Sequence, residues 1–95
     1  MYKLSNLAAE DFSSVYEYTW RRFGPQQADK YTAELDSLLI LLANNPQMGR
    51  DCANLIEGVR RHEHGQHAIF YQYADNGIFI IRILHQQMNP ELHLL

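Results

Sequence analysis

The chain of 95 residues has almost no cysteine: Cys52 is the only one, so an internal disulfide is excluded. A reducing cytoplasm is the simplest location for such a chain. No motif that activates a thiol surrounds Cys52, and a Cys–His nucleophilic pair is therefore not predicted. We expect this side chain to fill a small, partly buried space.

Long hydrophobic runs are also missing. The longest candidate, Leu38–Ala43, is far shorter than the roughly 18 consecutive apolar residues that a membrane-spanning helix needs. The chain does not open with a basic region followed by an apolar run, so no secretory signal is predicted. The sequence therefore predicts neither export nor a membrane partner.

Positive charge is scarce, because the net charge is −3 and the only lysines are Lys3 and Lys30. This balance gives no general electrostatic case for nucleic acid, and direct sequence-specific nucleic-acid binding is not expected. The second half nevertheless contains Arg60, Arg61 and Arg82 together with all five histidines, which predicts a local positive face. The glycines are isolated, so no phosphate-binding loop is present.

The remaining composition, 46% hydrophobic and 12% aromatic, predicts one globular domain over residues 1–95. Ser5 has the character of an N-cap, and apolar side chains at helical spacing follow it as far as Phe23. Gly24-Pro25 then fits a helix stop followed by a new helix, which we expect over Gln26–Ala43. The short joint predicts an antiparallel helical hairpin.

Strands are expected on both sides of this hairpin. Tyr2–Leu4 alternates as a short first strand, and the apolar runs His67–Tyr73 and Ile78–His85 flank an Asn-Gly turn. Gln47–Asn54 is expected to be a loop, and the charged stretch Glu57–His64 an edge strand. The predicted fold class is α+β in the order β-α-α-β-β-β, with the helical hairpin packed against a small twisted, mainly antiparallel sheet.

The last strand contains the first candidates for a site, because Arg82 and His85 interrupt an otherwise apolar segment. RNA cleavage needs a base for the 2′-hydroxyl, a cation for the phosphate and an acid for the leaving oxygen. Arg82 and His85 suit the last two roles, and Glu57 or Glu63 suits the first. Each residue also has a structural interpretation, in which Arg82 bridges a helix carboxylate and His85 caps backbone groups at the strand end.

Histidine spacing raises the question of a metal site at His62, His64 and His67. Gly65 interrupts this run, and no cysteine or carboxylate near it completes a ligand set. We predict no metal site and no cofactor.

Several strings, in the same order and spanning nearly the whole chain, resemble the ParE branch of the RelE/ParE toxin superfamily of bacterial toxin–antitoxin modules. Leu4-Ser5 is followed by Ala8, Asp11 and Phe12, and the first helix ends in Arg22-Phe23-Gly24. The later strings are Leu41–Gly49, Gly58–Arg61, His67–Tyr71 and Ile81–His85.

This resemblance implies a cytoplasmic toxin that a small antitoxin neutralises by folding its disordered tail along the toxin surface. ParE-type members are associated with inhibition of DNA gyrase, which makes a non-enzymatic inhibitor of growth our favoured interpretation. The alternative is a ribosome-dependent mRNA endoribonuclease of RelE type, and a third interpretation is a degenerate toxin that only binds its antitoxin. The central strand His67–Gln72 lacks the cation cluster of such nucleases.

The resemblance also divides the candidate residues between binding of the target and contact with the antitoxin. Asp11 is the plausible helix partner of Arg82, since both match recurrent ParE residues. The candidates for target binding are Arg60, Arg61, His67, Arg82 and His85, and the candidates for antitoxin contact are Tyr18, Trp20 and Tyr31. Alternation along a strand places Arg60 and Arg61 on opposite faces. Residues 86–95 have no obvious place in the core, and we expect a mobile or partner-bound tail.

Overall fold

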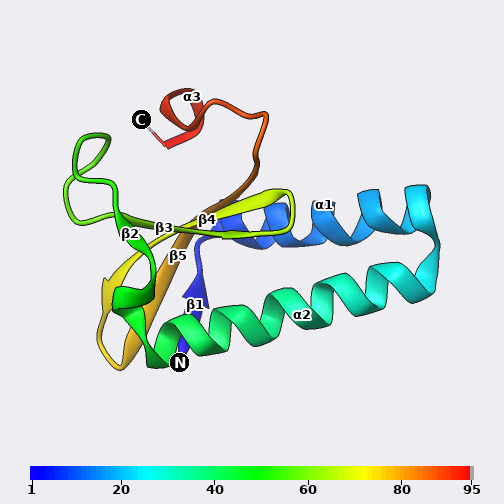
Figure 1. The fold of residues 1–95 in the computed structure, drawn as a ribbon, viewed down its shortest axis with the longest axis horizontal. Coiled ribbons are helices and arrows are strands. Elements are labelled where there is room, and N and C mark those ends of the chain that lie inside the picture. The colour runs from blue at the N-terminus through cyan, green and yellow to red at the C-terminus, as the bar shows by residue number, and fades with distance from the viewer. Residues whose placement is uncertain (95) are drawn as a thin grey trace.

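The computed structural model describes residues 1–94 and contains one five-stranded sheet with a helical hairpin against it (Figure 1). In chain order the elements are β1 (Tyr2–Leu4), α1 (Asn6–Phe23), α2 (Pro25–Asn44), a 3₁₀ turn η1 (Pro46–Met48), β2 (Arg50–Asp51), β3 (Arg60–His64), β4 (His67–Ala74), β5 (Gly77–His85) and α3 (Pro90–Leu94). The strands lie in the order β1-β5-β4-β3-β2, and β1 alone runs parallel to its neighbour. The α+β prediction is confirmed, with β2 and α3 as additions.

Helix α1 begins where its sequence signal predicts. The Ser5 hydroxyl accepts the Ala8 N–H at 2.9 Å and donates to the Ile81 carbonyl at 2.7 Å, so one side chain caps the helix and ties it to β5. Ala8, Val15 and Thr19 are the buried residues of the helix, at the spacing of one helical face.

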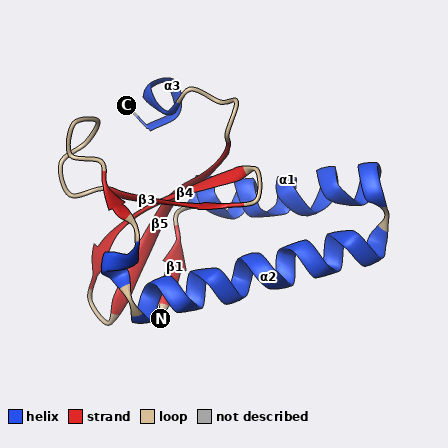
Figure 2. Cartoon of the chain, in the orientation of Figure 1, coloured by secondary structure: helices blue, strands red, loops and turns tan. Residues whose placement is uncertain are grey.

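A single residue, Gly24, joins α1 to α2. Its φ of +90° suits glycine, and Pro25 occupies the first position of α2. The two helices run antiparallel, and the end of the hairpin near this joint extends well past the sheet (Figure 2). Because no strand lies under this end, several aromatic side chains of α1 stay exposed there.

The β4–β5 hairpin confirms the Asn-Gly prediction, with Asn76 at a φ of +63° and Gly77 at +151°. Glycine is also required at position 77 by packing, because a Cβ there would lie 1.7 Å from the Met1 carbonyl oxygen. That carbonyl accepts the Ile78 N–H at 3.1 Å, so the turn and the start of β1 form together.

Strand β3 is shorter than predicted and less of an edge. It begins at Arg60, and the two residues of β2 pair with Arg60 and Arg61. The Arg60 guanidinium donates to the carbonyls of Gly49 and Gln47 and so fixes this loop against the strand. Within residues 1–94, no strand pairs with the outer edge of β3 beyond Arg61, so the predicted edge exists over His62–His64.

Apolar side chains form a separate cluster on each face of the sheet. The larger cluster lies between the sheet and the two long helices. A smaller one on the other face, which we call the second face, centres on Val59, Ala68, Phe70 and Leu84. Leu94 of α3 packs on this smaller cluster, and α3 lies across the sheet from α2 (Figure 1). Residue 95, the last of the predicted tail, lies outside the described residues. The mobility expected for residues 86–95 remains a prediction.

The residues that the structure describes include no helix that has both the length and the apolar character needed to cross a membrane.

Candidate functional site

Three histidines form a row across the end of the sheet. Strand register places His64 opposite His67 and His67 opposite His85, so one imidazole comes from each of β3, β4 and β5. All three face the long helices, where Tyr31 of α2 has ring-centroid distances of 5.1 Å to His64 and 5.7 Å to His67. The rings of His67 and His85 meet edge to face at 5.5 Å.

Hydrogen bonds assign the tautomer of His67. The Tyr31 hydroxyl lies 3.0 Å from the His64 carbonyl oxygen and 2.8 Å from His67 Nδ1. A carbonyl only accepts, so the hydroxyl proton is donated there, and Nδ1–H of His67 donates to the Tyr31 oxygen. Neutral His67 therefore has no proton on Nε2.

Burial lowers the pKa of His67 from 6.5 to about 4. Positive charge on His85 or His64 adds to this effect, and the Asp11 carboxylate opposes it weakly. His67 is consequently an uncharged imidazole at neutral pH, with its acceptor nitrogen fixed.

His85 caps the chain where β5 ends. Its Nδ1 accepts the Gln87 N–H at 3.2 Å, which leaves Nε2–H to donate to the Gln66 side-chain oxygen at 3.2 Å. This is the backbone-capping role that the sequence suggested as the structural interpretation of His85, and it orients the ring beside His67.

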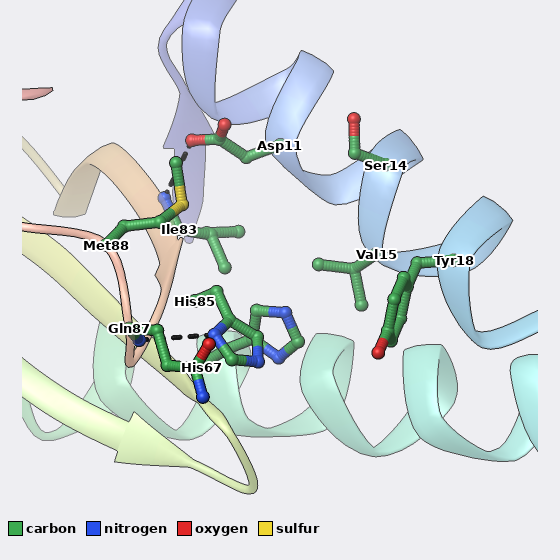
Figure 3. A pocket seen from close by; sticks show the side chains of 9 residues that line it. All are labelled: Asp11, Ser14, Val15, Tyr18, His67, Ile83, His85, Gln87 and Met88. Atoms are coloured by element: carbon green, nitrogen blue, oxygen red, sulfur yellow. Dashed lines mark hydrogen bonds between the residues drawn. The ribbon is translucent and has the colours of Figure 1, made fainter. Parts of the chain in front are cut away.

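The histidine row lies beside a groove between α1 and the ends of β4 and β5. Two hollows of about 450 and 280 Å³ share Tyr18, His67 and His85 as lining residues. Figure 3 shows His67 and His85 close together, facing Val15 and Tyr18 of α1. We call these two connected hollows, with their shared lining residues, the α1 groove.

Aromatic and apolar side chains form much of the rest of the wall. Val15 and Met88 line the first hollow, and Phe23 and Tyr31 line the second. Arg22 is the only arginine or lysine of either lining, and it lies 5.7 Å from the centre of the Tyr18 ring. The candidates predicted for antitoxin contact include Tyr18 and Tyr31 but not Val15, Phe23 and Met88.

Arg82 lies apart from this groove in a dense contact with α1. Its Nε and Nη2 donate to the two carboxylate oxygens of Asp11 at 2.8 and 3.0 Å, and its Nη1 donates to the His93 carbonyl at 3.3 Å. The Asp11 carboxylate also accepts the Ile83 N–H at 2.9 Å. The hydrogen bonds that Arg82 donates to Asp11 raise the pKa of Arg82. The predicted Asp11–Arg82 bridge is confirmed.

The candidates for RNA cleavage do not converge. Arg82 lies opposite Phe70 on the second face, whereas His85 belongs to the histidine row on the helix face. Glu63 pairs with Arg61 at 3.0 Å and Arg50 at 2.9 Å, and Glu57 is exposed in the loop before β3. No base, cation and acid from this set therefore surround a common point.

Arg60 and Arg61 lie on opposite faces of β3, as their alternation predicts. Arg60 is bound to loop carbonyls, and the Arg61 guanidinium lies 5.2 Å from the centre of the Phe70 ring. The antitoxin-contact candidates differ in how exposed their side chains are. Tyr18 and Trp20 are about half exposed, whereas Tyr31 is partly buried against the histidine row.

Over residues 1–94, no group of three or more His, Cys, Asp or Glu side chains is placed to hold a metal ion. His62, part of the spacing pattern considered above, lies opposite Ile69 and outside the histidine row.

Comparison with known proteins gives consistent results. Residues 2–90 match the model of the family described as the ParE toxin of the type II toxin–antitoxin system parDE. The chain is 39% identical to Toxin ParE1 of Caulobacter vibrioides over 93 residues, and 34% identical to Toxin ParE1 of Mycobacterium tuberculosis over 94 residues. Each alignment covers 98% of this chain and 96% of the relative. A solved structure titled "Chromosomal ParDE TA system from P. aeruginosa" has the same fold, with a TM-score of 0.74 at 24% identity, over 88% of this chain and 92% of that one.

Proposed function

Because the chain belongs to the ParE family of toxins from type II toxin–antitoxin systems, we propose that it arrests growth by binding DNA gyrase and blocking replication. It acts in the cytoplasm as an inhibitor and not as an enzyme. A cognate antitoxin neutralises it by folding its disordered tail on the toxin surface.

The observation that carries this proposal is the arrangement of Arg82. A phosphate-binding arginine of a nuclease must present its guanidinium to the substrate, next to the acid and the base. Here Nε and Nη2 donate to Asp11, Nη1 donates to the His93 carbonyl, and the arginine side chain is only 12% exposed. The side chain that resembles a catalytic cation is thus committed to joining α1 to β5.

Two surface features support an antitoxin partner. Apolar and aromatic side chains in the lining of the α1 groove suit the apolar face of an amphipathic helix, and Tyr18 and Trp20 of α1 lie exposed. Beside it, the uncovered edge of β3 over His62–His64 can accept an added strand. A helix followed by a strand would cover both features.

Expression of the chain in bacteria without antitoxin tests the proposal, with growth, cell shape and mRNA integrity scored in the same culture. We expect growth arrest with filamentation, DNA-damage signalling and intact transcripts, and co-expression of the antitoxin should restore growth. Rapid cleavage of translated mRNA would replace the proposal with the RelE-type nuclease. Normal growth would leave only the antitoxin-binding role.

A further inference from the structure

In the histidine row beside the α1 groove, one accessible ring nitrogen has no hydrogen-bond partner. His67 Nε2 has no proton, as the bond from His67 Nδ1 to Tyr31 shows, and it makes no hydrogen bond with residues 1–94. Within residues 1–94, His64 Nε2 is the one fully buried side-chain nitrogen or oxygen without a hydrogen-bond partner, so His67 Nε2 is not fully buried. This nitrogen is therefore open to the groove.

The other polar groups of the histidine row are either paired or out of reach: His64 Nε2 has no partner, but it is buried and His64 lines neither hollow. His85 uses one ring nitrogen for the Gln87 N–H and the other for Gln66. Asp11 at the edge of the first hollow is bound to Arg82 and to the Ile83 N–H. In this row, a partner entering the groove meets His67 Nε2 as the free acceptor.

We propose that His67 is a specificity-determining residue for the antitoxin: its Nε2 accepts a hydrogen bond from an N–H or O–H side chain on the antitoxin segment that fills the α1 groove. This inference rests on the proposed function, since it assigns a ligand group to the neutralising partner. A segment that covers the groove removes water from Nε2, and an apolar side chain there leaves the acceptor unsatisfied. The groove thus favours a segment that presents one donor at this point.

The surroundings of His67 oppose the alternative, in which a charged imidazole binds a carboxylate. Imidazoles of His64 on β3 and His85 on β5 flank the ring, and Tyr31 of α2 receives its Nδ1–H. From α1, the Asp11 charge is largely compensated by Arg82, while Arg22 adds positive charge to the groove. The lowered pKa of His67 agrees with an uncharged ring at neutral pH.

Binding of the antitoxin encoded beside the toxin gene, measured by calorimetry at pH 7.5, tests this assignment with three variants. His67→Phe keeps a ring but removes the acceptor, and His67→Gln restores an acceptor of similar reach. His93→Phe is the matched control, because His93 lies in α3, outside both the groove lining and the uncovered edge of β3. Circular dichroism confirms that each variant is folded.

We expect His67→Phe to weaken binding about tenfold or more, because a buried acceptor bond is lost. His67→Gln should recover most of the affinity, and His93→Phe should match the original chain. The ratio between the original chain and His67→Phe should stay constant from pH 8 to 6 and shrink below pH 5, where His67 gains a proton. Nitrogen NMR of labelled histidine should show unprotonated Nε2 in the free chain and a hydrogen-bonded Nε2 in the complex.

Other results overturn the inference. Equal affinity of His67→Phe and the original chain would reduce His67 to a structural role, while the antitoxin itself still binds. A ratio that rises between pH 8 and 6 would mean that protonated His67 binds a carboxylate. Failure of the original chain to bind the antitoxin at all would instead contradict the proposed function, together with this inference.

Discussion

At the scale of single residues, side chains with apparent catalytic character divide into structural and accessible ones. Arg82 is held by Asp11 and the His93 carbonyl, and Arg60 by the loop carbonyls of Gly49 and Gln47. His67 differs, because one of its ring nitrogens stays open to a groove. A cation inside an apolar strand is consequently poor evidence for a site until its partners are known.

Removal of the carboxylate in Asp11→Ala should lower the free energy of unfolding by about 3 kcal/mol, since it leaves a mostly buried guanidinium and the Ile83 N–H without their partner. Urea denaturation followed by circular dichroism measures this loss. Glu17→Ala is the control, because it breaks an exposed pair with Arg21 and should change stability by less than about 0.5 kcal/mol. Similar small effects of both substitutions would contradict the structural role of Asp11.

The lowered pKa of His67 predicts a specific pH dependence of stability. The folded chain releases the His67 proton near pH 4, whereas the unfolded chain binds it below about 6.5, so unfolding takes up a proton between these values. The contribution is complete above pH 6.5 and declines as the pH falls toward 4. Because His67 is partly exposed, we expect its protonation to lower the free energy of unfolding by about 1–2 kcal/mol.

Urea denaturation at pH 7.5 and pH 5 measures this term. His67→Gln should lose less stability on acidification than the original chain, because glutamine does not titrate. His62→Gln is the control for removal of a histidine elsewhere in the sheet. Its loss of stability between pH 7.5 and pH 5 should be larger than that of His67→Gln. Identical pH dependence in the original chain and His67→Gln would show that burial does not shift the pKa of His67.

At the scale of elements, the sequence predicted those whose signal is local. Helix α1 has its Ser5 cap and apolar stripe, α2 has Pro25 at its start, and the β4–β5 hairpin has Asn76-Gly77. Strand β2 was missed, because two charged residues have no strand pattern of their own. Arg60 holds them beside β3 through bonds to carbonyls distant in sequence.

The histidine row was missed for a related reason. The turn at Gly65 predicts that the strands before and after it pair antiparallel, but it does not predict that His64 lies opposite His67. The pairing of His67 with His85 depends on an irregularity between Phe70 and Tyr71, where Ile81 is the extra residue of β5. Without this bulge His67 would oppose Leu84, so the site depends on a register shift that sequence patterning does not show.

The tail yields a prediction at the same scale. Helix α3 contains no buried residue, and Leu94 and the His93 carbonyl supply its contacts with the sheet. Because such a segment opens at little cost, amide exchange in residues 88–94 should be far faster than in β4 and β5. Near-complete protection of these amides in the free chain would contradict the expected mobile tail.

At the scale of the whole molecule, the sheet separates two surfaces. The α1 groove and the histidine row lie on the helix side, and Arg61, Phe70 and Arg82 lie on the second face, partly under α3. Arg50 and Arg61 share the single carboxylate of Glu63 on this side, which leaves a net positive charge among the three. Antitoxin on the helix side and target on the second face are thus geometrically compatible.

Supercoiling of relaxed plasmid by purified DNA gyrase, with this chain added in increasing amounts, tests the central claim most directly. We expect supercoiling to fall with toxin concentration and cleaved complexes to accumulate, and both effects should disappear when the antitoxin is mixed with the toxin first. Unchanged supercoiling at toxin concentrations in large excess over gyrase would contradict gyrase as the target.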